Sequence, residues 1–171
     1  MDKKKPSFEE AMNAALLWCN AWEEGSLSDV VLADRVAELV ETKEGARGFF
    51  VISLSSNCPL MDRLPDPLIF QLRKSGDLIV ELTVKNLAMS SAMALEHKLN
   101  QNFKYQTESE RIISRCIDLL RLLEPNSVKK YLEKMIDATK NKGAEVNFLE
   151  RWEYNEQQKI AIADNLNSVA E

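Results

Sequence analysis

The sequence predicts an all-α fold, a single-domain bundle of six to seven helices over residues 1–171. Only five Gly and five Pro occur in the 171 residues, which is too few for a turn-rich all-β sandwich. Apolar residues recur at helical spacing behind two capping-box patterns. The segment 78–100 is long and apolar on nearly all sides, so we expect it to form the central helix around which the others pack.

The first two elements carry the clearest signals. Ser7 followed by Glu10 is a capping box, and Gly25 is well placed to end the helix that it opens. The apolar stripe of this helix comprises Phe8, Met12, Ala15, Cys19 and Trp22. Ser28 is a second N-cap signal, followed by an apolar stripe that runs to Val40. Because the connection is short, we expect an antiparallel pair of helices.

The middle of the chain leaves two alternatives open. The apolar run 49–54 fits a buried strand or a buried helix, because periodicity does not separate the two for so short a segment. Three prolines between residues 59 and 67 indicate an extended connection, after which Asp66-Pro67 begins a short helix over 67–75.

Residues 70–73 and 80–85 alternate strictly between apolar and polar side chains, which is typical of a β-hairpin. Glu81 and Lys85, however, share a helical face, and helix-tolerant residues continue without a stop signal to about Asn100. We therefore favour one helix over 78–100. The alternative is an α+β fold with a small hairpin or sheet within 49–85.

Three helices are expected after residue 100. Thr107 and Glu110 form a second capping box, Pro125 interrupts the helix that follows, and Asn126 or Ser127 caps the next one, which ends by Gly143. The last segment carries a thinner apolar stripe over 148–166. We expect it to dock, with fraying at 1–6 and 167–171.

Composition excludes several functional classes. With 45% hydrophobic and 29% charged residues the chain is typical of a globular protein, and its net charge of −5 disfavours nucleic-acid binding. The run Lys3–Lys5 precedes Pro6 without an apolar region, so we expect no signal peptide. Glu81 and Lys85 lie within the most apolar segment, which favours a core helix over a membrane span. Three cysteines without CxxC spacing fit a reduced, cytoplasmic protein.

Few residues suggest chemistry. His97 is the only histidine and lacks a Glu-x-x-His context, so we expect no metal and no cofactor. Cys19 and Cys116 lie on core stripes, whereas Cys58 lies in the proline-flanked connection, where exposure is expected. Glu81 and Lys85 mark the solvent edge of the central helix, line an internal polar cavity or form a buried pair. The candidate ligand-binding residues are Cys58, Glu81, Lys85, Met89, Met93 and His97.

The candidate interface residues are Trp152, Tyr154, Arg111 and Arg115. The two arginines share one helix face with Glu108 and Asp118, a charge ladder typical of a solvated surface that can also meet an acidic partner. Trp152 and Tyr154 are aromatic residues in a polar segment, a pattern typical of contact surfaces.

Two stretches, 45–51 and 84–93, resemble a group of conserved hypothetical proteins from cyanobacteria that have no assigned activity. The resemblance covers about a quarter of the chain, carries no motif of known chemistry, and implies a source without implying a mechanism.

The leading hypothesis is a cytoplasmic interaction, scaffold or regulatory protein without a catalytic site, as a homodimer or with a protein partner. The alternative is a helical domain that binds a small ligand or a metal, as an enzyme or sensor, in a pocket beside the central helix. The sequence leaves enzymatic activity uncertain and leans against it, because no set of residues has the geometry of an active site.

Overall fold

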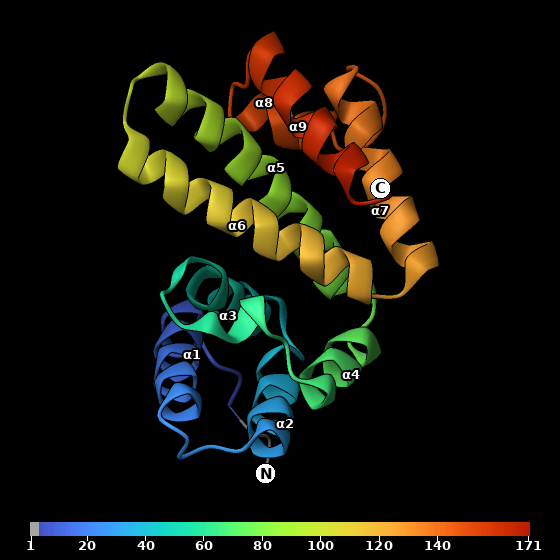
Figure 1. Cartoon of the computed structure of the whole chain (residues 1–171). Coiled ribbons are helices and arrows are strands. Elements are labelled where there is room, and N and C mark those ends of the chain that lie inside the picture. The colour runs from blue at the N-terminus through green and yellow to red at the C-terminus, as the bar shows by residue number, and fades with distance from the viewer. Residues whose placement is uncertain (1–3) are drawn as a thin grey trace. The chain divides into compact units, whose positions relative to one another are not determined.

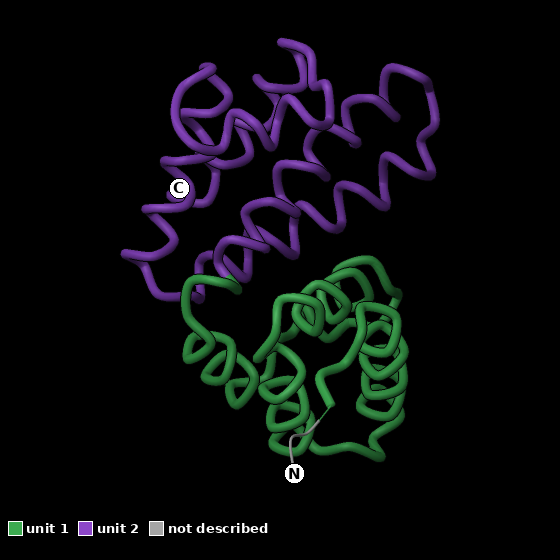
Figure 2. Tube along the Cα trace, turned by 180° about the vertical axis from the view of Figure 1, so that it is seen from behind, with its two compact units in different colours: residues 1–79 green, residues 80–171 purple. Residues whose placement is uncertain are grey.

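A computed structural model describes residues 4–171 of the chain. Within these residues it contains nine α-helices and one 3₁₀ helix and no strand, so the all-α prediction is confirmed (Figure 1). The chain divides into two compact units, Met1–Ile79 and Val80–Glu171 (Figure 2). There are more helices than the six or seven expected, because the apolar run 49–54 is helical and the last segment forms two helices.

The first two helices begin as the sequence predicted. Helix α1 (Phe8–Glu23) opens with the complete capping box of Ser7 and Glu10, and Gly25 follows its end with a φ of 83°. Helix α2 (Asp29–Leu39) is capped by the Ser28 hydroxyl, which accepts a hydrogen bond from the Val31 amide. The predicted fraying of residues 1–6 falls partly on residues 1–3, which lie outside the described residues.

Helix α3 (Lys43–Ser55) is the main packing partner of α1, and α2 packs chiefly against α4. The expected pairing of α1 with α2 is thus a minor contact. The reason lies at Gly48, where an added Cβ would come within 2.5 Å of the Ala11 Cβ and 2.8 Å of the Phe8 carbonyl oxygen. The bare glycine backbone lets α3 approach α1 more closely than any side chain would allow.

The proline-rich connection is more compact than expected. Pro59–Asp62 forms the 3₁₀ helix η1, in which Leu60 and Met61 are buried, and η1 contacts both α1 and α3. Helix α4 (Asp66–Lys74) follows with a proline in its first turn, one residue earlier at each end than the predicted range of 67–75.

Helix α5 (Asp77–Leu99) is continuous, which confirms the favoured prediction and shows that the hairpin alternative was wrong. The alternation at 70–73 and 80–85 misled because both stretches lie inside helices. By length and composition alone α5 is long and apolar enough to cross a membrane. Since 56% of its most apolar window is buried inside the structure, it equally fits the core helix of a soluble protein.

Unit 2 also contains α6 (Phe103–Leu122) and α7 (Pro125–Thr139), whose starts differ from the sequence prediction. Thr107 lies inside α6, and its hydroxyl donates to the Phe103 carbonyl instead of capping the helix. Glu124, rather than Asn126 or Ser127, caps α7, because its carboxylate accepts from both of those amides and Pro125 occupies the first turn.

The last segment forms α8 (Val146–Arg151) and α9 (Glu156–Ser168). The chain turns between them at Glu153, whose φ is 54°, and Asn155 with Gln158 forms a capping box that begins α9. The end of α9 is docked where we expected fraying, since Val169 is buried and Arg121 holds two carbonyl groups there.

Candidate functional site

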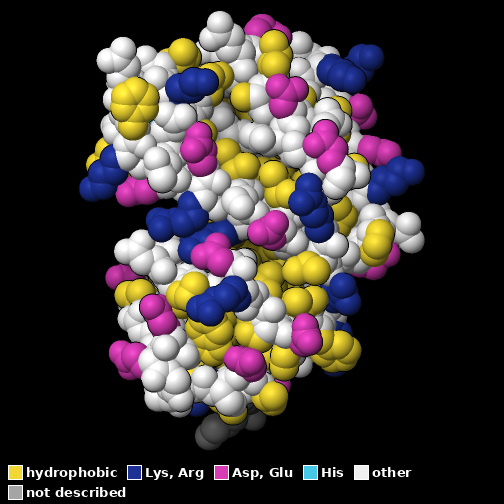
Figure 3. Space-filling view, viewed as in Figure 1, with side chains coloured by type: hydrophobic (Ala, Val, Ile, Leu, Met, Phe, Trp, Pro, Cys, Tyr) yellow, Lys and Arg dark blue, Asp and Glu magenta, His cyan; other side chains and the backbone are white. Residues whose placement is uncertain are grey.

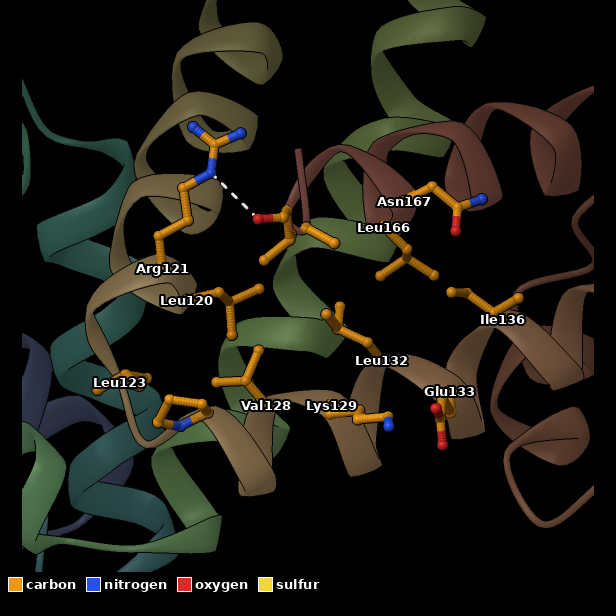
Figure 4. A pocket seen from close by; sticks show the side chains of 13 residues that line it. Leu120, Arg121, Leu123, Val128, Lys129, Leu132, Glu133, Ile136, Leu166 and Asn167 are labelled. Carbon is orange, nitrogen blue, oxygen red and sulfur yellow. Dashed lines mark hydrogen bonds between the residues drawn. The ribbon is translucent and has the colours of Figure 1, made fainter.

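Unit 2 contains an apolar groove. It has a volume of about 510 Å³ and is formed by α6, α7 and α9 (Figure 4). Nine of its 13 lining residues are apolar, and we call it the α6–α7–α9 groove. Its lining residues are Leu120, Arg121, Leu123, Pro125, Val128, Lys129, Leu132, Glu133, Ile136, Leu166, Asn167, Val169 and Ala170.

The long wall of the groove follows from the spacing of apolar residues on α7. Val128, Leu132 and Ile136 recur every four residues, which places them along one side of the helix over about 12 Å. Leu120 from α6 and Leu166 from α9 point toward them in Figure 4. Ile136 is half-buried, whereas Leu120 and Leu166 are almost fully buried at the bottom of the groove.

Arg121 joins α6 to the end of α9 at the edge of the groove. Its Nε donates to the Val169 carbonyl oxygen at 3.2 Å (Figure 4). One of its terminal nitrogens donates to the Ser168 carbonyl oxygen at 2.7 Å. A cation at this place also interacts favourably with the negative end of the α9 dipole. The side chain fixes the separation of the two helices that bound the groove.

The rim of the groove is polar and exposed. Arg121, Lys129, Glu133 and Asn167 all lie at its edge, so the rim carries two cations and one anion. Across the face shown in Figure 3, side chains of both signs are interspersed with apolar ones. An apolar floor with a charged rim is the usual organisation of a binding surface.

The candidate ligand-binding residues do not gather at this groove. Cys58 lies in unit 1, and the expectation that it is exposed was wrong, since only 5% of its surface is accessible. The following residues turn back into η1, which packs against α1 and α3 and covers the thiol. Burial raises the pKa of the Cys58 thiol, and the nearby Glu23 carboxylate adds to that shift.

The remaining candidates lie on α5. Lys85 donates to the Glu81 carboxylate at 2.9 Å, and its ammonium lies 5.5 Å from the centre of the Phe148 ring of α8. Both members of this pair are partly exposed, as expected for the solvent edge of the helix. Met89 is half-buried and Met93 is 38% exposed, whereas His97 lies against the Tyr105 ring, with centroids 5.6 Å apart. Their binding role stays a prediction.

The candidate interface residues divide into exposed and buried ones. Trp152 is 49% exposed, while Tyr154 is half-buried, and burial together with the Glu96 carboxylate raises its pKa to about 12. Arg111 is half-buried and Arg115 is 1% exposed, so the expectation of a solvated arginine ladder was wrong at Arg115. The face of α6 that carries Arg115 also carries the fully buried Cys116 and Leu119, and the arginine is enclosed with them.

Among residues 4–171, no three His, Cys, Asp or Glu side chains lie close enough together to hold a metal ion. The single histidine and the scattered acids leave the α6–α7–α9 groove as the feature whose chemistry is easiest to interpret. That chemistry is apolar: it buries hydrocarbon surface and orients it with a few rim charges.

Comparison with known proteins places the chain in a family. A family model described as "Uncharacterised conserved protein UCP020893" matches residues 7–169. The chain belongs to this family. The match covers both compact units, from the capping box of α1 to the docked end of α9, and fits the resemblance to an uncharacterised family noted from the sequence. No curated protein and no solved structure is significantly similar to the chain.

The sequence reasoning missed the groove because Leu120, Leu123, Val128, Leu132 and Leu166 were assigned to inward-facing stripes and residues 167–171 to a frayed end. The signal lay in their number: α6 and α7 each carry a full apolar stripe, and α9 adds Leu166 and Val169. Such an excess of inward-facing side chains near one set of helix ends indicates a surface that the chain does not cover completely.

Proposed function

We propose that this family member is a cytoplasmic interaction protein, and that the α6–α7–α9 groove binds an amphipathic helix of a partner protein. The observation that carries the proposal is the groove itself, with nine apolar lining residues and a charged rim. Grooves between packed helices commonly accept the apolar face of a helix through side chains spaced at i, i+4 and i+7.

The dimensions of the groove support an occupant of this kind. Val128, Leu132 and Ile136 extend over about 12 Å, which corresponds to two turns of a helix lying alongside α7. The residues at the bottom of the groove are almost fully buried, so little of their surface is accessible from outside. We therefore expect side chains of the partner, and not its backbone, to enter the groove. Two or three large apolar side chains on adjacent turns fit this description.

The charges at the rim favour a partner with acidic flanks. Arg121 and Lys129 outnumber Glu133 there, although the chain as a whole carries a net charge of −5. An acidic residue beside the apolar anchors would face these cations, whereas a second copy of the chain would bring further negative charge. A symmetric dimer would also place groove against groove, and a concave surface does not fill itself.

The test is a selection of helical peptides from a displayed random library, with the full chain as target. We expect enrichment of sequences with apolar residues at i, i+4 and i+7 and acidic residues between them. Affinity for the best peptide should fall at least tenfold in Ile136→Asp. Ile136 is half-buried, and peptide binding would remove water from the new carboxylate without giving it a partner. Lys129→Glu should weaken acidic peptides selectively.

The matched control is Val30→Asp, an equally polar change at an exposed apolar residue of α2 in unit 1. Equal binding of the selected peptides to wild type and Ile136→Asp would refute the groove as the binding site. Native mass spectrometry of the same proteins separates the other occupants. A dimer that Ile136→Asp dissociates would identify a second copy as the occupant.

The volume of the groove also suits a small apolar ligand, the second candidate function. Pockets that bind such molecules measure roughly 300–1,000 Å³, and this one lies within that range. A reproducible added mass on the native monomer, absent from Ile136→Asp, would favour this function over helix binding.

A further inference from the structure

Two cysteines that are far apart in the sequence meet in unit 1. The Cys58 thiol donates to the carbonyl oxygen of Cys19 at 3.5 Å, across 39 residues of chain. Both residues are buried, with 1% of the Cys19 surface and 5% of the Cys58 surface accessible. This contact links the middle of the protein's first helix, α1, to the start of η1.

The side chains of the two residues are also close. The Cys19 thiol interacts with the Cys58 thiol and lowers its pKa, against the upward shift caused by burial and by Glu23. Cys58 is the N-cap residue of η1, and η1 contacts α1.

A cavity lies close to this pair. Glu23, which interacts with the Cys58 thiol, and Pro59, its chain neighbour, both line a cavity of about 310 Å³. Arg63 lies in the wall of the same cavity, together with the carboxylates of Glu23 and Asp29. The cavity thus reaches the chain neighbour of Cys58, whereas Cys116 lies fully buried in unit 2.

We propose that Cys19 and Cys58 form an intramolecular disulfide when the protein meets a low-molecular-weight disulfide oxidant such as oxidised glutathione. The Cys58 thiolate attacks one sulfur of the oxidant, and the glutathione thiolate that leaves takes up the proton. The Cys19 thiolate then attacks the Cys58 sulfur of the mixed disulfide and releases the second glutathione. The protein loses two electrons and two protons, and the oxidant becomes two thiols.

The disulfide would close a loop that contains α2 and α3 and join α1 to η1 covalently. Closing a loop of this length restricts the unfolded chain, so the oxidised protein should melt at a higher temperature than the reduced protein. Unit 1 would thus have two states of different stability, set by the thiol–disulfide balance around it.

The test uses the full chain, incubated with oxidised glutathione, alkylated under denaturing conditions and measured by intact mass and peptide mapping. We expect a mass loss of two hydrogen atoms, one alkylated cysteine (Cys116), and a linked pair of peptides that contain Cys19 and Cys58. Cys116→Ser should behave in the same way, with no cysteine left to alkylate.

Cys19→Ser and Cys58→Ser should each lose the internal disulfide. The proposal is overturned if three thiols are alkylated after oxidation of the wild type, or if the linked peptides include Cys116. It is also overturned if a stable glutathione adduct on Cys58 persists in the wild type. The wild-type peptide map alone decides the pairing should a serine variant fail to fold, which circular dichroism would reveal.

Discussion

The two compact units use their apolar side chains differently. In unit 1, α1 and α3 approach so closely that Gly48 has no room for a side chain, and Phe49, Phe50 and Leu54 are buried. In unit 2, helices α6, α7 and α9 leave a groove of about 510 Å³ between them. Unit 1 also exposes apolar side chains such as Leu17 and Phe70, whereas the groove of unit 2 gathers nine apolar residues in one cavity, which directs the search for function to unit 2.

The largest expected effect is the difference in stability loss between truncating a fully buried side chain of unit 1 and truncating a side chain that lines the groove of unit 2. Phe50→Ala removes a fully buried ring in unit 1 and should lower the free energy of unfolding by about 3–5 kcal/mol. Ile136→Ala removes a half-buried side chain at the groove and should cost about 1 kcal/mol or less. Chemical denaturation of both variants measures the difference, and equal losses would contradict the distinction between the units.

Gly48→Ala tests the close approach of α1 and α3 directly. The new Cβ would overlap Ala11 and two backbone atoms of α1, so we expect a loss of about 1–3 kcal/mol despite the better helix propensity of alanine. Hydrogen exchange measured by mass spectrometry should show faster exchange in α1 and α3 peptides. Val51→Ala, at a 40% exposed position of α3, is the control. If Gly48→Ala were more stable than the wild type, α1 and α3 would have room for a Cβ at this contact.

The sequence predicted most helices because their signals are local. Capping boxes, apolar spacing and the glycine after α1 act within a few residues, and the starts of α1 and α2 were confirmed. Thr107 failed because a capping-box pattern also fits inside a helix, where the hydroxyl bonds one turn back. The alternation before and within α5 failed as a strand signal because both stretches lie inside helices, where Phe70 is 61% exposed although Leu72 is buried.

The candidate site was less predictable because it depends on contacts between distant segments. Leu120, Val128 and Leu166 each have the pattern of a core residue, and only the packing of three helices shows that they line a groove. Cys58 was expected to be exposed because it lies in the proline-flanked connection. In the structure it precedes η1, and its thiol contacts the Cys19 carbonyl of α1. Spacing along the chain carries no information on either contact.

Arg121→Ala should loosen the groove with a moderate effect. The variant loses two hydrogen bonds to the carbonyl groups at the end of α9, and we expect a loss of about 1 kcal/mol. Backbone amides near residues 165–171 should exchange faster, while unit 1 is unchanged. Arg35→Ala, an exposed residue of α2, is the control. Unchanged exchange at the end of α9 would mean that apolar packing alone holds this helix.

The smallest effect concerns the pH dependence of stability at Tyr154, a residue outside the groove. Burial and Glu96 raise the pKa of Tyr154 from its usual value of 10 to about 12, so the fold favours the neutral phenol. The stability that this preference contributes is fully present below pH 10, the unfolded value, and is lost as the pH rises through about 12. Thermal melts across this window, with tyrosinate absorbance as a parallel signal, should show a decline of the melting temperature in the wild type that is shallower in Tyr154→Phe.

Because Glu96 carries part of the pKa shift, Glu96→Gln should move the Tyr154 ionisation to lower pH. An unmoved ionisation in Glu96→Gln would leave burial as the whole cause.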